Sequence, residues 1–142
     1  MPNLMGIEFI RLTAENAALL DRVADDVFDD PIVPERVAAF LAEPSHLMLI
    51  AVDAGRVVGQ IAAIIHRHPD RVSELYVDNL GVAPQHRRRG IARRLLDDIC
   101  ALGRGLGCGD AWVGTEVDNL PARGLYARYA EAETFVLYEF DL

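Results

Sequence analysis

The apolar positions of this chain recur with two different spacings, which separate strand-like from helix-like segments. Compact runs rich in β-branched and aromatic residues predict strands over residues 6–12, 46–52, 56–65, 74–82, 111–116 and 134–142. Apolar residues at every third or fourth position predict helices over residues 13–27, 35–41, 90–102 and 119–129. The third helix is the most regular and has an apolar face formed by Ile91, Leu95, Ile99 and Leu102.

These elements follow one another as strand, two helices, three strands, helix, strand, helix, strand. Asp53, Ala54 and Gly55 provide turn chemistry for an antiparallel hairpin between the second and third strands. The order predicts an α+β (mixed α/β) domain with four helices around a twisted, largely antiparallel sheet of about six strands. The 142 residues fit a single domain, 1–142, and 51% hydrophobic content supports a sizeable core.

The charge balance limits the possible partners. A net charge of −8 disfavours nucleic acid and anionic membranes and favours a small cationic partner. The N-terminus lacks a basic region followed by a long apolar run, so we predict neither export nor membrane insertion. Cys100 and Cys108 lack the histidine neighbours of a zinc site, and His66 and His68 lack a third ligand, so we expect no metal. We expect a cytoplasmic protein with both cysteines reduced.

A basic turn separates the strand at 74–82 from the longest helix. Five arginines fall within residues 87–94, at a helix start where the helix dipole disfavours cations. Gly90 lets the backbone approach a ligand closely, and the free N–H groups of a helix start bind phosphates. The turn therefore predicts a phosphate or pyrophosphate site, the simpler alternative being a solvated basic helix start. It is neither a Rossmann nor a Walker motif, because G-x-G-x-x-G is absent and the chain contains no lysine.

Two motifs carry a resemblance that covers almost the whole chain. The turn, Gln85 followed by RRRGIA at 87–92, resembles the R/Q-x-x-G-x-G/A acyl-CoA motif of the GNAT superfamily of N-acetyltransferases. The segment NLPARGLY at 119–126 resembles the N-x-x-A-x-x-L-Y segment of the same family. More narrowly, ELYVDNLGV at 74–82 followed by HRRRGIA is similar to aminoglycoside N-acetyltransferases that modify the 3-amino group.

The resemblance implies a GNAT-like fold in which a V-shaped split between the fourth and fifth strands admits the pantetheine arm of acetyl-CoA. A bulge at residues 79–81, where Gly81 lies, would interrupt the strand. Tyr126 would protonate the departing thiolate. The backbone of residues 80 and 82 would bind the arm, and that of residues 87–92 the pyrophosphate. The implied cofactor-binding residues are Leu80, Gly81, Val82, Arg87, Arg88, Arg89, Gly90, Ile91, Ala92 and Asn119.

An acceptor amine must lose a proton before it attacks the thioester. Strand alternation places Glu74, Tyr76 and Asp78 on one side, and Asp78 lies nearest the expected reaction centre. Glu74 acting through water and Glu116 at the end of the next strand are the other candidates. Each of the three carboxylates is equally compatible with a strand-end salt bridge, and proximity alone can supply much of the rate. The aminoglycoside enzymes commonly have an acidic residue directly before the position of Leu80, whereas Asn79 stands here.

An acidic cluster of Asp25, Asp26, Asp29 and Asp30 points to a cationic acceptor, with Asp29, Asp30 and Glu116 as its expected contacts. The leading hypothesis is acetyl-CoA-dependent N-acetylation of a small amine, aminoglycoside-like or polyamine-like, by direct transfer in a ternary complex. An acyl-CoA sensor without turnover is the second, and a nucleic-acid contact through the arginines is disfavoured by the surrounding acidity. A seventh strand is missing or supplied by a partner subunit, which makes a homodimer an expectation.

Overall fold

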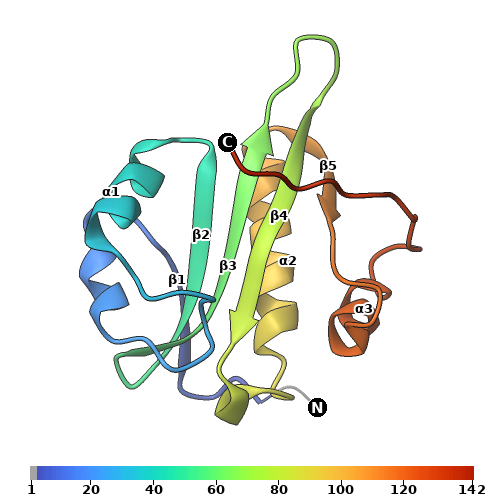
Figure 1. Cartoon of the computed structure of the whole chain (residues 1–142). Coiled ribbons are helices and arrows are strands. Elements are labelled where there is room, and N and C mark those ends of the chain that lie inside the picture. The colour runs from blue at the N-terminus through green and yellow to red at the C-terminus, as the bar shows by residue number, and fades with distance from the viewer. Residues whose placement is uncertain (1–2) are drawn as a thin grey trace.

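A computed structural model describes residues 3–142, so the first two residues of the expected domain lie outside the described range. This range contains five strands and three α-helices (Figure 1). The strands are β1 Ile7–Arg11, β2 His46–Asp53, β3 Arg56–His66, β4 Ser73–Val82 and β5 Cys108–Val113. The helices are α1 Pro34–Ala42, α2 Ile91–Gly105 and α3 Leu120–Tyr126, with short 3-10 helices at Ala17–Asp21 and Pro84–His86.

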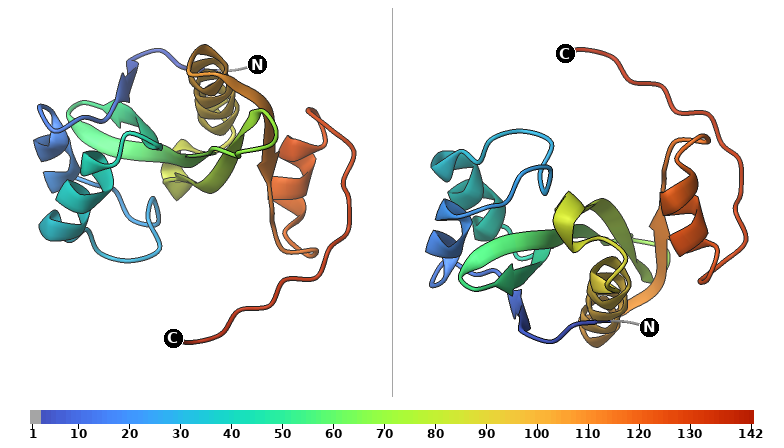
Figure 2. Two further views of the ribbon diagram at one scale, coloured as in Figure 1. Left: turned by 90° about the horizontal axis from the view of Figure 1, so that it is seen from above. Right: turned by 90° about the horizontal axis from the view of Figure 1, so that it is seen from below.

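The five strands form one sheet in the order β1-β2-β3-β4-β5, antiparallel except for the parallel pair β4 and β5. Helix α2 covers one face, and the segment between the first 3-10 helix and α1 lies on the other (Figure 2). The apolar face of α2 is buried at Ile91, Leu95 and Ile99, as its periodicity predicts. A side chain at Gly103 would come within 2.8 Å of Leu75, so this glycine lets α2 lie close to β4. None of the helices in residues 3–142 has the length and apolarity needed to cross a bilayer.

The predicted helix over residues 13–27 is wrong except for one 3-10 turn. Val23 instead forms a parallel bridge with Val57. The Ala24 N–H donates to the Val57 carbonyl at 2.9 Å, and the Val57 N–H donates to the Arg22 carbonyl at 2.8 Å. Pairing with the start of β3, distant in sequence, therefore overrides the local helical pattern.

The predicted final strand over residues 134–142 is also wrong in the described structure. This segment is extended but has no strand beside it within residues 3–142, and it runs clear of the body (Figures 1 and 2). An extended chain becomes a strand only when a neighbour accepts its backbone hydrogen bonds. Residues 3–142 therefore form a sheet of five strands rather than six, and they contain three α-helices rather than four. The predicted mixed α/β class is confirmed.

Strand β4 changes partners halfway along its length. Its parallel pairing with β5 ends at Val77 opposite Val113, and beyond this point β5 and α3 diverge from β4 (Figure 1). On the other edge, Ala63 pairs with Val77 and Ala62 with Asn79, so Asp78 is the extra residue of a bulge. The predicted split between the fourth and fifth strands is present. The bulge lies at Asp78, immediately before the residues 79–81 where the presence of glycine led us to expect it.

Candidate active site

The basic turn leaves backbone N–H groups free at the start of α2. Arg88 (φ 62°) and Gly90 (φ 91°) both have left-handed backbone conformations, and Gly90 is the N-cap. The first helical hydrogen bond runs from Arg94 N–H to the Gly90 carbonyl at 3.0 Å. The N–H groups of residues 91–93 therefore lack helical acceptors, and no side chain of the described chain caps the helix. Together with the helix dipole, they form a place for an anion.

The three consecutive arginines of this turn differ in their hydrogen bonds and exposure. Arg89 donates to the carbonyls of Asn3 and Met5 at 2.9 and 3.4 Å, which ties the N-terminal segment to the turn. Arg87 donates from Nε to the Val82 carbonyl at 3.3 Å. Both Arg87 and Arg88 are exposed. The Arg88 guanidinium group and the terminal N–H groups of Arg87 are thus available to an anion at the turn, whereas Arg89 makes two backbone hydrogen bonds.

A buried side-chain amide connects β3 and β4 with residues 25–30, the acidic segment that carries the four aspartates of the acidic cluster. Gln60 is fully buried, and its Nε2 donates to the Val27 carbonyl at 3.2 Å and to Asn79 Oδ1 at 2.7 Å. Asn79 Nδ2 in turn donates to Asp29 Oδ2 at 3.4 Å. The bulge makes this possible, because Asn79 pairs with Ala62 and so lies on the face of Gln60 rather than on the face of α2. The predicted acceptor residue Asp29 is therefore connected to the bulge of β4.

Sequence reasoning missed Gln60, although one signal was present. It is the single polar side chain between Val57 and Ile65, in a run whose other members are apolar or glycine. Its Oε1 is buried without a partner among the described residues. A buried polar side chain in an apolar strand is rare enough to indicate a specific role.

The acidic segment borders a surface hollow of about 490 Å³. Asp29 and Asp30, both predicted acceptor contacts, lie on its rim with Asp21. The complete lining is Leu20, Asp21, Val23, Ala24, Phe28, Asp29, Asp30, Pro31, Ile32 and Pro34. Glu116, the third predicted contact, is exposed between β5 and α3, and no side-chain contact joins it to Asp29 or Asp30 in the described chain. The structure thus brings two of the three carboxylates together beside the hollow.

Asp78 and Tyr76 lie where the β4–β5 pair begins to open. Burial raises the pKa of Tyr76, and the charge of Asp78 and a hydrogen bond with it raise that pKa further. The Tyr76 ring stacks on Trp112 of β5, with 4.2 Å between ring centroids. Because the charge of Asp78 raises the pKa of Tyr76, the two side chains lie close to each other at the bulge. Asp78 is exposed and has no cationic partner among the ion pairs of residues 3–142.

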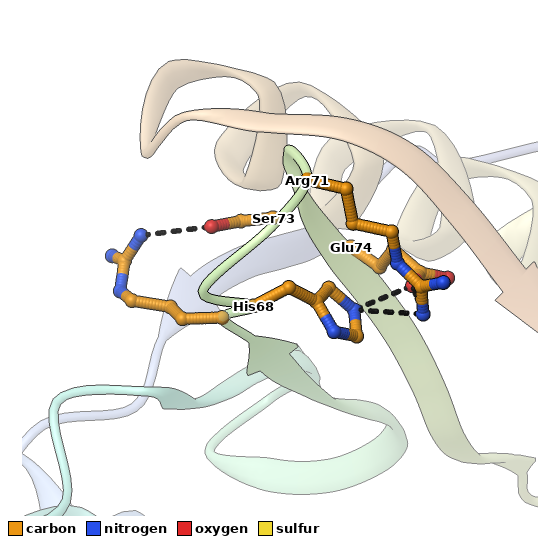
Figure 3. A network of polar contacts seen from close by, with 5 residues as sticks. His68, Arg71, Ser73 and Glu74 are labelled. Atoms are coloured by element: carbon orange, nitrogen blue, oxygen red, sulfur yellow. Dashed lines mark hydrogen bonds and ion pairs between the residues drawn. The ribbon is translucent and has the colours of Figure 1, made fainter.

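Glu74 sits in a local ion-paired cluster at the start of β4 (Figure 3). Its Oε1 lies 2.6 Å from His68 Nε2 and 2.9 Å from Arg71. Although desolvation opposes the change, the hydrogen bond with His68 and the charge of Arg71 lower the pKa of Glu74. The arrangement matches the salt-bridge alternative and weakens Glu74 as a base, so its catalytic role stays a prediction.

The cluster predicts a pH-dependent stability contribution. Because the folded-state pKa of Glu74 is lowered from 4.5, its stabilising effect is present above pH 4.5 and is lost as the pH falls through the lowered value. Glu74→Gln should therefore lower the melting temperature at pH 7, and the difference from wild type should vanish in acid. Thermal unfolding between pH 3 and pH 8 measures this. Glu133→Gln, at an exposed carboxylate outside the ion pairs of residues 3–142, should change the melting temperature little at any pH. A Glu74→Gln deficit that persists below the lowered pKa would contradict the assignment.

Helix α3 carries the other two predicted residues. Asn119 caps it, because Asn119 Oδ1 accepts from the Ala122 N–H at 3.2 Å. Tyr126 is half-buried against the core, and burial raises its pKa. Its hydroxyl is thus protonated at neutral pH, as a proton donor must be. No group of three or more potential metal ligands gathers within the described residues.

Comparisons with known proteins identify related folds. The family model described as the acetyltransferase (GNAT) family matches residues 14–130. An aminoglycoside acetyltransferase from an uncultured soil metagenomic sample superposes with a TM-score of 0.83 at 25% identity, covering 97% of this chain and 99% of that one. No curated protein matches the chain in sequence.

Two further solved structures share the fold at lower identity. AAC(6')-Iy, in complex with the bisubstrate analogue CoA-S-monomethyl-acetylneamine, has a TM-score of 0.79 at 17% identity and covers 96% of this chain and 99% of its own. The ribosomal-protein-alanine N-acetyltransferase from Brucella melitensis biovar Abortus 2308 has a TM-score of 0.74 at 19% identity, with coverage of 96% and 99%. The same architecture therefore occurs in proteins named for small-molecule and for protein acceptors.

Proposed function

Because the chain belongs to the acetyltransferase (GNAT) family, which makes it an N-acetyltransferase with acetyl-CoA as donor, we propose that its acceptor is a small polycationic amine. The observation that carries the proposal is the acidic hollow at Asp29 and Asp30, joined through Asn79 to the bulge of β4. A cationic acceptor held there would lie beside the strand along which the donor binds. The aminoglycoside acetyltransferases among the solved structures are consistent with this acceptor class.

The donor fits the residues of the basic turn and the open edge of β4. Free N–H groups of residues 91–93 and the exposed guanidinium groups of Arg87 and Arg88 provide partners for a diphosphate. Beyond Val77 the edge of β4 facing β5 has no strand neighbour in the described chain. The backbone of Leu80 and the N–H of Val82 can therefore bind an extended pantetheine arm, while the Val82 carbonyl accepts from Arg87. Gly90, with its left-handed backbone, keeps the turn open for the ligand.

The remaining residues divide the proton transfers between them. We assign acceptance of the ammonium proton to Asp78, because it is exposed at the split and lacks the cationic partners that hold Glu74. The amine nitrogen then attacks the thioester carbonyl carbon, and the C–S bond breaks as the C–N bond forms. Tyr126 gives its hydroxyl proton to the departing thiolate. The nitrogen releases its second proton to solvent as the amide forms, and Tyr126 regains a proton from solvent. Direct transfer of this kind needs both substrates bound at once.

An acceptor panel tests the proposal. Purified protein is incubated with acetyl-CoA and an aminoglycoside, a polyamine, a monoamine or a peptide with a free N-terminus, and thiol release is followed. We expect turnover with the polycationic amines and much less with the monoamine and peptide. Preference for the peptide would assign a protein acceptor instead. Acetyl-CoA binding in calorimetry without turnover on any amine would favour an acyl-CoA sensor.

A cytoplasmic location is consistent with the free thiols of Cys100 and Cys108.

The acidic hollow predicts a charge effect confined to the acceptor. The double variant Asp29→Asn/Asp30→Asn should raise KM for a polycationic amine about 5- to 30-fold, since each of the two partly exposed charge pairs contributes ~0.5–1 kcal/mol. KM for acetyl-CoA should not change. Asp25→Asn/Asp26→Asn is the matched control, because it removes the same charge from the same segment but not from the lining of the hollow. Equal effects of the two double variants would indicate general electrostatic attraction rather than a binding site.

A further inference from the structure

Gln60 is a buried side chain that stability alone does not explain. Among residues 3–142 it is the one polar side chain of the buried core, with an exposed fraction of 0%, and its Oε1 has no hydrogen-bond partner there. A buried acceptor without a partner destabilises the fold, and an apolar side chain of the same length would avoid that loss. The part of the side chain that the fold uses is therefore its Nε2 group, which donates two hydrogen bonds.

The hydrogen bonds that begin at Gln60 have a fixed direction. The Val27 carbonyl can only accept, so it must face the Nε2 end of Gln60. The second N–H of Nε2 reaches Asn79 Oδ1 at 2.7 Å. Because its oxygen is occupied, Asn79 presents Nδ2 to Asp29 Oδ2 at 3.4 Å, and the carboxylate oxygen accepts. The chain of donors thus runs outward from the core and ends on Asp29.

Gln60 holds the acidic segment at two points. Its bond to the Val27 carbonyl fixes the backbone where that carbonyl packs on Gly81, since a Cβ at Gly81 would overlap the carbonyl oxygen. The bond through Asn79 holds the side chain of Asp29, two residues further along the segment. Asp29 lines the hollow of about 490 Å³. The position of this part of the hollow therefore depends on one amide in β3.

We propose that Gln60 is a positioning residue for the acceptor amine, acting through Asn79 on the carboxylate of Asp29. In the function proposed above, on which this role rests, Asp29 contacts the cationic acceptor. With Oδ2 held by Asn79, Asp29 keeps Oδ1 for the acceptor, and a carboxylate that is already fixed loses less conformational freedom when the amine binds. Gln60 is fully buried and touches neither substrate, so its effect lies in acceptor affinity rather than in the proton transfers.

Gln60→Met tests this role, because methionine fills similar space without an N–H donor. We expect KM for the best acceptor of the amine panel to rise about 3- to 10-fold, the effect of one lost hydrogen bond, and KM for acetyl-CoA to change less than about twofold. Ile61→Val is the matched control. It shortens the next fully buried side chain of β3, on the α2 face, and should lower the melting temperature without changing either KM. An unchanged acceptor KM in Gln60→Met, or an equal rise in Ile61→Val, would overturn the proposal.

A double-mutant cycle separates action through Asp29 from a general loosening of the fold. In an Asp29→Ala background no carboxylate remains to be positioned, so Gln60→Met should raise the acceptor KM less than about twofold further. Asn79→Leu removes the middle of the chain at a partly buried site and provides the same comparison if Gln60→Met does not fold. Independent effects that multiply fully in both double variants would contradict positioning of Asp29.

The wild-type enzyme distinguishes failure of this role from failure of the proposed function. A preference for the peptide or the monoamine would reject the polycationic acceptor alone, because these amines are also cations and their KM should still rise in Gln60→Met. Normal turnover of a polycationic amine with an unchanged KM in Gln60→Met would reject the role of Gln60 alone. Absence of turnover on every amine would reject both.

Discussion

Replacing Tyr126 by phenylalanine should reduce kcat for acetyl transfer about 100-fold, which is the lower end of what a positioned proton donor contributes. The ring would still pack against the core, so folding and KM for acetyl-CoA should change little. Because burial raises the pKa of Tyr126 from 10.0, the wild-type enzyme should not lose activity through this group below pH 10. Steady-state kinetics between pH 6 and pH 10 measures both effects.

Tyr129 offers a matched control three residues further on. Its hydroxyl donates to Asp97 outside the split, and burial together with Asp97 raises its pKa to about 12. Tyr129→Phe should keep kcat within about twofold of wild type. A Tyr126→Phe enzyme that keeps more than half its activity would remove the proton-donor role. Equal losses in the two variants would indicate that the position of α3 matters, and not one hydroxyl.

Gly81→Ala should be the most destabilising alanine substitution at a glycine of the sheet. An added Cβ would overlap the Val27 carbonyl oxygen and lie 3.0 Å from its carbon, and this neighbour is backbone that cannot rotate away. We expect the free energy of unfolding to fall by about 3 kcal/mol, the upper part of the usual range for overpacking. The Gln60 bond to Val27 would be lost with it, and the acidic segment would move. Denaturant unfolding followed by circular dichroism measures the loss.

Gly124 makes the opposite prediction with the same substitution. It lies in α3, and a Cβ there would meet no atom within 4 Å. Gly124→Ala should raise the free energy of unfolding by ~0.5–1 kcal/mol, because alanine favours a helix over glycine. If both alanine variants were equally stable, the close approach of Val27 to β4 would be wrong.

Local patterns predicted the central elements well. Strands β2, β3 and β4 and helix α2 begin and end within a few residues of their predicted bounds, because burial on one or both faces sets their pattern. The basic turn was predicted as a free helix start, and its N–H groups lack helical acceptors as expected. These features depend on neighbours in sequence.

Features that depend on distant contacts were not predictable in the same way. The segment after the first 3-10 helix pairs with Val57, more than 30 residues away, and therefore does not form the predicted helix. Gly81 suggested a bulge, yet it serves the close approach of Val27, and the bulge falls at Asp78. The connection from Gln60 through Asn79 to Asp29 spans three segments. Pattern alone cannot show which of these segments meet.

Trp112 stands at the start of the split, stacked on Tyr76, and it is the only tryptophan of the chain. The fluorescence of an indole ring responds to the polarity of its surroundings and to nearby groups. Here all of the tryptophan fluorescence comes from one position, where the two strands begin to diverge. The protein thus carries an intrinsic optical reporter at the mouth of its cleft, by which occupancy can be followed in solution without a label.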